Sequence, residues 1–148
     1  MCFTIDKEFK TRAQAKELAT QPRIARTNIT VYKWLVAEIF EGKEKIIHYH
    51  SPHRGMRYRP GETKTAEKFS FRFVDVCGWR SEINKGLHSY HWSVAEELFK
   101  RYKKSFTKFN NVLIKCIIPK GTPYFKNNAG EYVSLAIKTP DEYKHAKF

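Results

Sequence analysis

The segment NITVYKWLVAEIFEGKEKIIHYH, residues 28–50, predicts a β-hairpin. Its first part, residues 28–40, is rich in the β-branched and aromatic side chains that favour strands. Glu41 and Gly42 then start a turn, and residues 45–50 return as a second strand. We therefore expect an antiparallel pair of strands here. The other elements are predicted from the segments on either side of this pair.

The sequence after the hairpin predicts further strands. Phenylalanines alternate with other residues over 68–79, which indicates a half-buried strand, and residues 82–92 are expected to form a loop that leads into a short strand. Residues 112–119 form a nearly continuous apolar run, which is typical of a central strand. Turn residues then separate two shorter strands, at 122–125 and 131–138.

Two helices are predicted from capping patterns. The first covers residues 10–20 and begins with a Thr-x-x-Gln box at Thr11, and the second covers residues 93–106 and begins with a Ser-x-x-Glu box at Ser93. The predicted fold class is therefore α+β, with a mostly antiparallel, split and twisted sheet and two main helices.

Length and charge indicate one domain with anionic partners. The 148 residues suit a single domain covering 1–148, and a hydrophobic fraction of 41% is enough for a packed core. The net charge of +13 favours nucleotides, nucleic acid or an acidic protein surface as partners. The alternative is a basic surface that is only solvated.

Cysteine usage and hydropathy predict a cytoplasmic protein. The three cysteines are an odd number without a Cys-x-x-Cys pair, so no disulfide framework is expected. No segment approaches the roughly 20 apolar residues that a membrane span needs. The N-terminus also lacks the apolar run of a signal peptide, and no membrane contact is predicted.

The segment HYHSPHRGMRYRPG, residues 48–61, concentrates cationic side chains without any acid. A guanidinium group matches the geometry of phosphate oxygens, so Arg54, Arg57 and Arg59 are candidate phosphate ligands. Strand alternation places Arg57 and Arg59 on one face, with Tyr58 on the other. The alternative is an edge strand whose arginines prevent aggregation.

Histidines in the same segment raise the question of a metal site. His48, His50 and His53 could bind zinc if Cys77 or His91 supplied a fourth ligand. The neighbourhood is strongly cationic and contains no cysteine pair, so we predict no metal and interpret them as surface and loop histidines.

The second half of the chain resembles a known family. The segments KGLHSYHWSVAEELF, VLIKCIIPKGTPYF and GEYVSLAIK, within residues 85–138, are similar to the back half of ADP-ribosyltransferase domains. Ser89 corresponds to the family's serine motif, residues 118–122 to a turn, and Glu131 to the catalytic glutamate. Either Lys33 or Arg54 corresponds to the family's first-strand arginine. The resemblance implies an ADP-ribosyltransferase-like fold, with NAD or a related nucleotide as substrate or ligand and no resident cofactor.

A second resemblance concerns the biological context. The Met-Cys start, the SPHRG segment and the HSY segment resemble small phage proteins, a class in which inhibitors of bacterial defence are common. This resemblance implies a viral anti-defence protein, with a host defence protein as a further partner.

These observations predict a basic, aromatic-lined nucleotide site. Aromatic rings suit stacking on a base or a nicotinamide ring, cations suit phosphates, and His88 and Ser89 are expected at the ribose. The predicted ligand-binding residues are Tyr32, Lys33, His50, His53, Arg54, Arg57, Arg59, His88, Ser89, Tyr90, Trp92 and Lys120.

Three functions remain open from the sequence. The first is a protein that sequesters a nucleotide signal, such as an NAD-like, ADP-ribose-like or cyclic nucleotide. The second is an ADP-ribosyltransferase or NAD glycohydrolase that uses Glu131 as its catalytic residue. The third is a nucleic-acid-binding protein, for which the basic stripe Lys100, Lys104 and Lys108 could follow a phosphate backbone.

Overall fold

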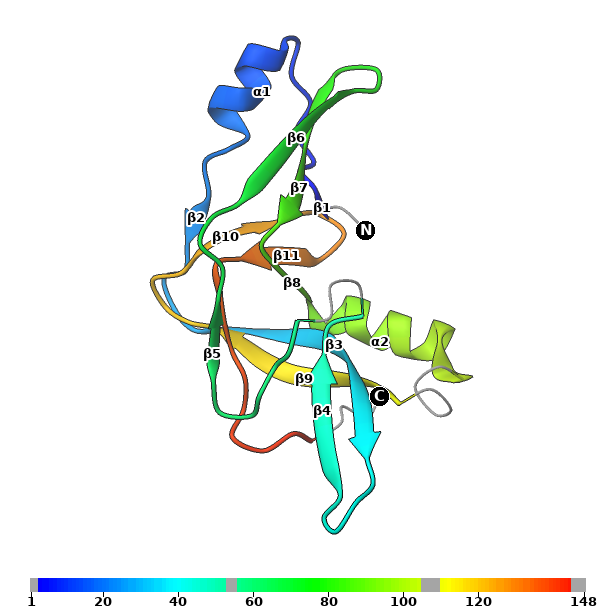
Figure 1. Ribbon diagram of the computed structural model, residues 1–148. Helices are drawn as coiled ribbons and strands as arrows, with labels where there is room; N and C mark the ends of the chain where they lie inside the picture. Colours follow the sequence, from blue (N-terminus) through cyan, green and yellow to red (C-terminus); the bar gives the residue numbers. More distant parts are fainter. Residues whose placement is uncertain (1–2, 53–55, 105–109, 145–148) are drawn as a thin grey trace.

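The computed structural model describes residues 3–52, 56–104 and 110–144 (Figure 1). All strand pairs within these residues are antiparallel, so the prediction of an α+β fold built on a mostly antiparallel sheet is confirmed. The elements are β1 (Phe3–Thr4), α1 (Arg12–Leu18), β2 (Arg23–Ile24), β3 (Ile29–Phe40), β4 (Ile46–His50), β5 (Thr63–Thr65), β6 (Ser70–Asp75), β7 (Trp79–Lys85), β8 (Leu87–Tyr90), α2 (Trp92–Arg101), β9 (Asn111–Ile118), β10 (Pro123–Lys126), β11 (Glu131–Ser134) and β12 (Ala136–Lys138).

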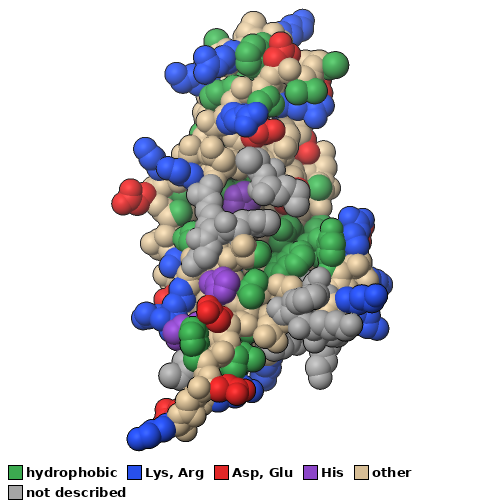
Figure 2. All heavy atoms as spheres, turned by 45° about the vertical axis from the view of Figure 1, so that its right-hand side comes forward, with side chains coloured by type: hydrophobic (Ala, Val, Ile, Leu, Met, Phe, Trp, Pro, Cys, Tyr) green, Lys and Arg blue, Asp and Glu red, His purple; other side chains and the backbone are tan. Residues whose placement is uncertain are grey.

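The long strand β3 is the centre of the larger sheet. It pairs with β9 along one edge and with β8 and β4 along the other, within the order β2-β10-β11-β8-β3-β9-β12-β5. The predicted hairpin is confirmed as β3 and β4, which project beyond the body of the molecule (Figure 1). Figure 2 shows this projection as a slender extension with Lys and Asp or Glu side chains near its tip.

One face of the larger sheet, here called the inner face, carries the main core. Alternate residues of β3 point to it, so that Val31 and Leu35 are fully buried. They pack with side chains from β9, β12 and the segment after β4, such as Ile114, Ile137 and Tyr58. The opposite face is called the outer face below.

A second, three-stranded sheet covers part of the outer face. Its strands have the order β1-β7-β6, and Figure 1 shows them above β10 and β11, next to α1. Phe3 of β1 and Ile83 of β7 pack against Phe125 and Val133 of the larger sheet. The outer face of β10 and β11 is therefore closed by this second sheet.

Two strand predictions are wrong. Residues 68–79 and the following predicted loop form the hairpin β6–β7, because Cys77 and Gly78 have positive φ angles and reverse the chain. The predicted strand 131–138 is two strands, because the chain leaves β11 at Leu135 and crosses to a different neighbour. There β12 pairs with β9 and β5, whereas β11 pairs with β10 and β8.

The helices begin close to where they were predicted. Thr11 is the N-cap of α1, and its hydroxyl accepts a hydrogen bond from the backbone N–H of Gln14, as the capping pattern predicts. The predicted cap of α2 is wrong: His91, not Ser93, is the N-cap, and its Nδ1 accepts from the backbone N–H of Ser93. The predicted end of this helix and Lys108 lie outside the described residues. Among the helices described, none has the length and apolar character needed to cross a membrane.

Candidate functional site

A cleft of about 390 Å³ lies where the start of α2 meets β2, β10 and the turn between β10 and β11. This volume falls within the range of small-molecule sites. Its charged lining residues are cations, and no carboxylate is among them. The lining residues are Arg23, His91, Ser93, Lys126, Asn127, Asn128, Ala129 and Gly130.

The turn between β10 and β11 forms one wall of this cleft. It is closed by the backbone N–H of Gly130, which donates to the carbonyl of Asn127 at 3.1 Å. Gly130 also accepts from the backbone N–H of His91 at 2.8 Å, which joins the turn to the start of α2. A Cβ at Gly130 would lie 2.8 Å from a methyl group of Val94, so only glycine allows this close approach.

The start of α2 forms the opposite wall. The helix spans ten residues and has no acidic residue in its first turn, so its N-terminal partial positive charge is not offset there. Nδ1 of His91 accepts from the backbone N–H of Ser93 at 3.3 Å and lies 2.8 Å from the Ser93 hydroxyl. Since Nδ1 accepts, the neutral imidazole ring carries its proton on Nε2 and can donate there.

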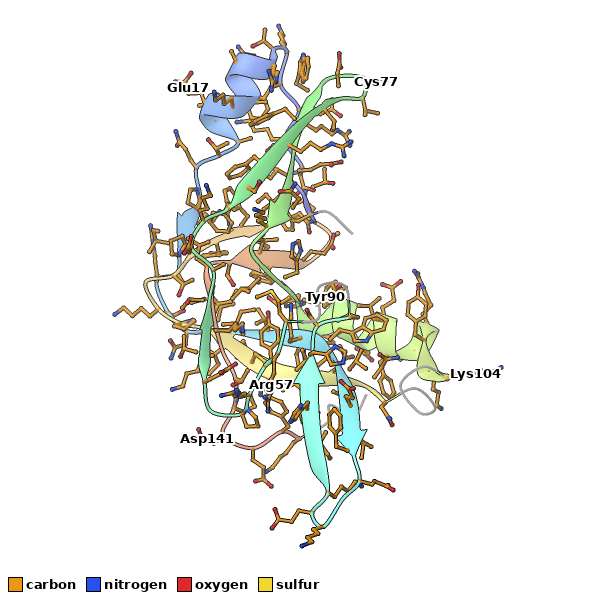
Figure 3. All side chains as sticks on the ribbon, viewed as in Figure 1. Glu17, Arg57, Cys77, Tyr90, Lys104 and Asp141 are labelled. Atoms are coloured by element: carbon orange, nitrogen blue, oxygen red, sulfur yellow. The ribbon has the colours of Figure 1, made fainter. Side chains whose placement is uncertain are left out.

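Three of the predicted residues lie in one cross-strand row, on the opposite face of the sheet from the cleft residue Lys126, which is opposite Tyr132. Tyr32 of β3 is opposite Tyr90 of β8, and Tyr90 is opposite Glu131 of β11. Directly opposed residues share a face, so the three side chains lie together on the outer face. Figure 3 shows Tyr90 where β8 leads into α2. Burial, together with the charge of Glu131, raises the pKa of Tyr90.

Glu131 is tied to the turn that lines the cleft. Its carboxylate Oε1 accepts from Nδ2 of Asn127 at 3.0 Å, and its backbone N–H donates to Oδ1 of Asn127 at 3.0 Å. Asn127 is buried and Glu131 is half-buried. The two hydrogen bonds therefore tie the carboxylate to a residue that lines the cleft, but on the face of the sheet opposite Lys126.

Two predicted ligand residues lie on the inner face, away from this row. Ser89 is fully buried, and its hydroxyl has no hydrogen-bond partner within the described part of the chain. Lys33 is buried too, and its Nζ donates to the carbonyl of His88 at 2.5 Å and lies 5.1 Å from the centroid of the Tyr58 ring. Burial lowers the pKa of Lys33 to about 8. Both side chains are enclosed in the core, so neither lines the cleft.

The predicted residues of the segment 48–61 lie on a different part of the molecule. Arg57 and Arg59 are exposed and Tyr58 is buried, so the predicted alternation is confirmed. Figure 3 shows Arg57 beside β4, apart from Tyr90. His50 is half-buried, with Nε2 3.7 Å from a carboxylate oxygen of Glu38. His53 and Arg54 lie outside the described residues.

The remaining predicted ligand residues, Trp92, His88 and Lys120, lie in three different elements. Trp92 follows His91 at the start of α2, is 54% exposed, and has its ring centroid 5.6 Å from that of His91. The side chain of His88 is half-buried, two residues before Tyr90 on β8. Lys120 is exposed in the turn between β9 and β10, where its backbone N–H donates to Oδ1 of Asn28. The structure thus places Trp92 beside the cleft and Lys120 away from it.

Sequence reasoning missed the residues that line the cleft. Arg23 and Lys126 are far apart in the chain and meet because β2 pairs with β10, with Arg23 opposite Tyr124. The turn KNNAG directly before Glu131 was the available signal, because it places a cation and two amides next to a carboxylate.

A second cleft has a different character. It has a volume of about 430 Å³ beside the β6–β7 turn and contains acids as well as a cation. Glu8 in this cleft pairs with Arg80. Its lining residues are Glu8, Phe9, Lys10, Asp75, Cys77, Gly78 and Trp79. Its mixed charge makes it a poorer anion site than the cleft at α2.

Metal-ligating side chains are not grouped in the described ranges 3–52, 56–104 and 110–144, which hold no cluster of three His, Cys, Asp or Glu residues suited to a metal. Comparison with family models, with curated proteins and with solved structures finds no match to this chain.

Proposed function

We propose that the protein binds a nucleotide in the cleft at the start of α2, through the phosphate groups of the ligand. The observation that carries this proposal is the lining of the cleft, which combines two cations, a histidine, a serine and two asparagines with no carboxylate. Such a lining favours an anion over a cation or a neutral apolar ligand.

The phosphate contacts are assigned to three groups. Arg23 offers a guanidinium fork that fits phosphate oxygens, and Lys126 offers a second positive charge from the neighbouring strand. The first backbone N–H groups of α2 add donors that carry partial positive charge. The Nε2 donor of His91, which also lines the cleft, would face the same phosphate.

The flat part of a nucleotide is assigned to Trp92. This indole is more than half exposed and directly follows His91, so it adjoins the cationic cleft. An aromatic face beside phosphate ligands suits a purine or nicotinamide ring. The ligand classes are an NAD-like or ADP-ribose-like molecule or a cyclic nucleotide signal, which the protein sequesters as an inhibitor of bacterial defence.

Glu131 supports a second candidate function, an ADP-ribosyltransferase-like or NAD glycohydrolase activity. Its carboxylate is held by Asn127, which lines the cleft, and it lies in the same row as Tyr90 and Tyr32. For a ligand that extends to the outer face, this carboxylate could stabilise the positive charge that develops at the anomeric carbon when the nicotinamide leaves. Sequestration needs no such group, so the two candidates differ in the fate of the ligand.

A thermal-shift screen with chromatographic recovery tests both candidates. The panel is NAD, ADP-ribose, cyclic ADP-ribose isomers and cyclic dinucleotides, and we expect at least one to raise Tm. Arg23→Ala and Lys126→Ala should each weaken its binding by roughly 10- to 100-fold, since a hydrogen bond to a charged group contributes about 1.5–3 kcal/mol. Lys85→Ala, which removes an exposed lysine of β7, is the matched control and should bind normally.

The outcomes separate the alternatives. A ligand recovered intact indicates sequestration, and a cleaved ligand indicates an enzyme. In the second case Glu131→Gln should abolish turnover and spare binding, and turnover retained by Glu131→Gln would exclude the proposed catalytic role. No shift with any nucleotide, or normal binding by both cleft variants, would refute the proposed function.

A further inference from the structure

The acidic residues of this protein are absent from two long stretches of the chain. Residues 18–37 and residues 98–130 contain lysines and arginines but no Asp or Glu. The structure places these two stretches side by side, because β3 pairs with β9 and β2 pairs with β10. Stretches that are separate in the sequence thus form two strand pairs, β3–β9 and β2–β10, to which these stretches contribute no carboxylate. Strands β11 and β8 lie between the two pairs in the sheet.

At the start of β3 and the end of β9 the outer face is open to solvent. Thr30 of β3 is opposite Ile117 of β9, which is opposite Lys138 of β12, and Tyr32 is opposite Lys115. These side chains alternate with the core residues Val31, Cys116 and Ile137, so they point away from the core. Thr30, Lys115 and Lys138 are exposed, whereas Tyr32 and Ile117 are half-buried.

Two further cations lie in the loops at the end of these strands. Arg26 and Lys120 are exposed in neighbouring loops, which are held together by two hydrogen bonds. The backbone N–H of Gly121 donates to the carbonyl of Ala25 at 2.8 Å, and that of Lys120 donates to Oδ1 of Asn28 at 2.9 Å. We define the outer basic face as Arg26, Thr30, Tyr32, Lys115, Lys120 and Lys138.

We propose that the outer basic face binds single-stranded nucleic acid. Its positive charges lie on two strands and in two loops rather than around one hollow, which suits an extended polyanion better than a mononucleotide. Tyr32 lies beside Lys115, so an aromatic ring for base stacking is next to a cation for the backbone. The nearest acid of this row, Glu131, is two strands away from Tyr32 and hydrogen-bonded to Asn127.

The shape of the face favours a single strand over a duplex. Its side chains project from a sheet, with threonine and lysine as their main polar types, and none of the described helices or hairpins extends from it to enter a major groove. Unpaired bases, in contrast, can lie flat against a sheet and stack on its aromatic residues. This proposal does not rest on the nucleotide cleft, since no residue of the outer basic face lines that cleft.

Fluorescence anisotropy with a labelled 20-nucleotide poly-dT or poly-U strand tests the proposal. The double variant Lys115→Glu with Lys138→Glu should lose at least about 10-fold in affinity at 100 mM salt. Affinity falls with salt, and the negative slope of log affinity against log salt should become shallower by about 1.4 in this variant. This is roughly 0.7 for each phosphate that is no longer neutralised. Lys10→Glu with Lys85→Glu changes the net charge equally at exposed positions elsewhere, and it should keep most of the affinity.

Tyr32→Leu and Lys126→Ala separate stacking and the cleft from simple charge attraction. Tyr32→Leu should weaken binding by about 5- to 100-fold, because a stacked base contributes roughly 1–3 kcal/mol. Lys126→Ala should leave the affinity for the strand within about two-fold. The proposal is overturned if the wild-type protein fails to bind either strand at 50 mM salt, or if the control double variant loses as much as Lys115→Glu with Lys138→Glu. Equal affinity for a 20-base-pair duplex or for heparin would overturn the assignment to a single strand.

Discussion

Replacing Lys33 by methionine should stabilise the protein. Lys33 lies on the inner face of β3 among apolar side chains, and within the described residues its ammonium group donates one hydrogen bond, to the carbonyl of His88. The Tyr58 ring, 5.1 Å away, gives further but weak support. Methionine has a similar length and no charge, so it fills the same space without the cost of a buried cation.

The magnitude follows from the pKa of Lys33. Burial lowers this pKa from 10.5 to about 8, and each pKa unit corresponds to about 1.4 kcal/mol, so the charged form is disfavoured by roughly 3 kcal/mol in the folded chain. The variant loses the hydrogen bond to His88, which contributes about 1 kcal/mol. We therefore expect Lys33→Met to raise the free energy of unfolding by about 2 kcal/mol at pH 7.

The gain should depend on pH in a defined direction. Between pH 8 and 10.5 the unfolded chain keeps a proton on Lys33 that the folded chain has lost, so the stability of the wild-type protein rises with pH in this window. The advantage of Lys33→Met should therefore shrink above pH 8. Burial raises the pKa of Cys116 to about 12, which lowers stability above pH 9, and the charge of Lys33 opposes this rise. Because the thiol stays protonated in both folded proteins up to pH 9.5, the loss is common to both over the measured range.

Urea unfolding followed by tryptophan fluorescence at pH 7, 8, 9 and 9.5 measures this difference. Lys64→Met is the control, because Lys64 lies 5.8 Å from the same Tyr58 ring but is less buried than Lys33. Its effect should stay within about 0.5 kcal/mol. A Lys33→Met protein that is less stable than wild type at pH 7, or a gain that is constant from pH 7 to 9.5, would refute the reasoning.

Two further substitutions test the packing around the candidate site. Gly130→Ala should cost about 1–3 kcal/mol, seen as a fall in Tm, because its φ is +79° and its Cβ would lie 2.8 Å from Val94. Gly121→Ala is the matched control, since its φ is +89° but its Cβ would meet no atom within 4 Å; an equal loss in both variants would show that packing against α2 does not matter. Ser89→Ala should leave stability unchanged or slightly higher and leave nucleotide binding intact, because the Ser89 hydroxyl is buried with no hydrogen-bond partner among the described residues. Calorimetric titration with the nucleotide found in the screen measures the binding, and a ten-fold loss would return Ser89 to the ligand site.

Several parts of the fold could be predicted from local patterns. The hairpin of β3 and β4, the apolar strand β9 and the cap at Thr11 depend on residues close together in the chain. The β6–β7 hairpin could not be predicted in this way, because Cys77 is not a residue that usually marks a turn and adopts a φ of 55° here. The break at Leu135 was also hidden, because it depends on which strands pair on either side of it.

In the candidate site, too, local patterns indicated single residues, whereas strand pairing decided which of them are neighbours. Tyr32, Tyr90 and Glu131 were each suspected from the sequence, but only the registers of β3, β8 and β11 place them in one row. Lys33 and Ser89 are direct neighbours of Tyr32 and Tyr90 in the chain, yet they point to the opposite face. Because side chains alternate along a strand, a shift of one residue decides between the core and the outer face.

The amino-acid sequence alone is enough to assign the class of this protein: a basic chain of antiparallel strands and two helices, with cations concentrated in stretches that lack acids. Composition and short-range periodicity are sufficient for these properties, since both are local. The folded chain is needed to show that Arg23 and Lys126 meet in a cleft at the start of α2, and that Lys115 and Lys138 share an open face. Such neighbours depend on strand order and register, which are set by the packing of the whole core rather than by any one segment.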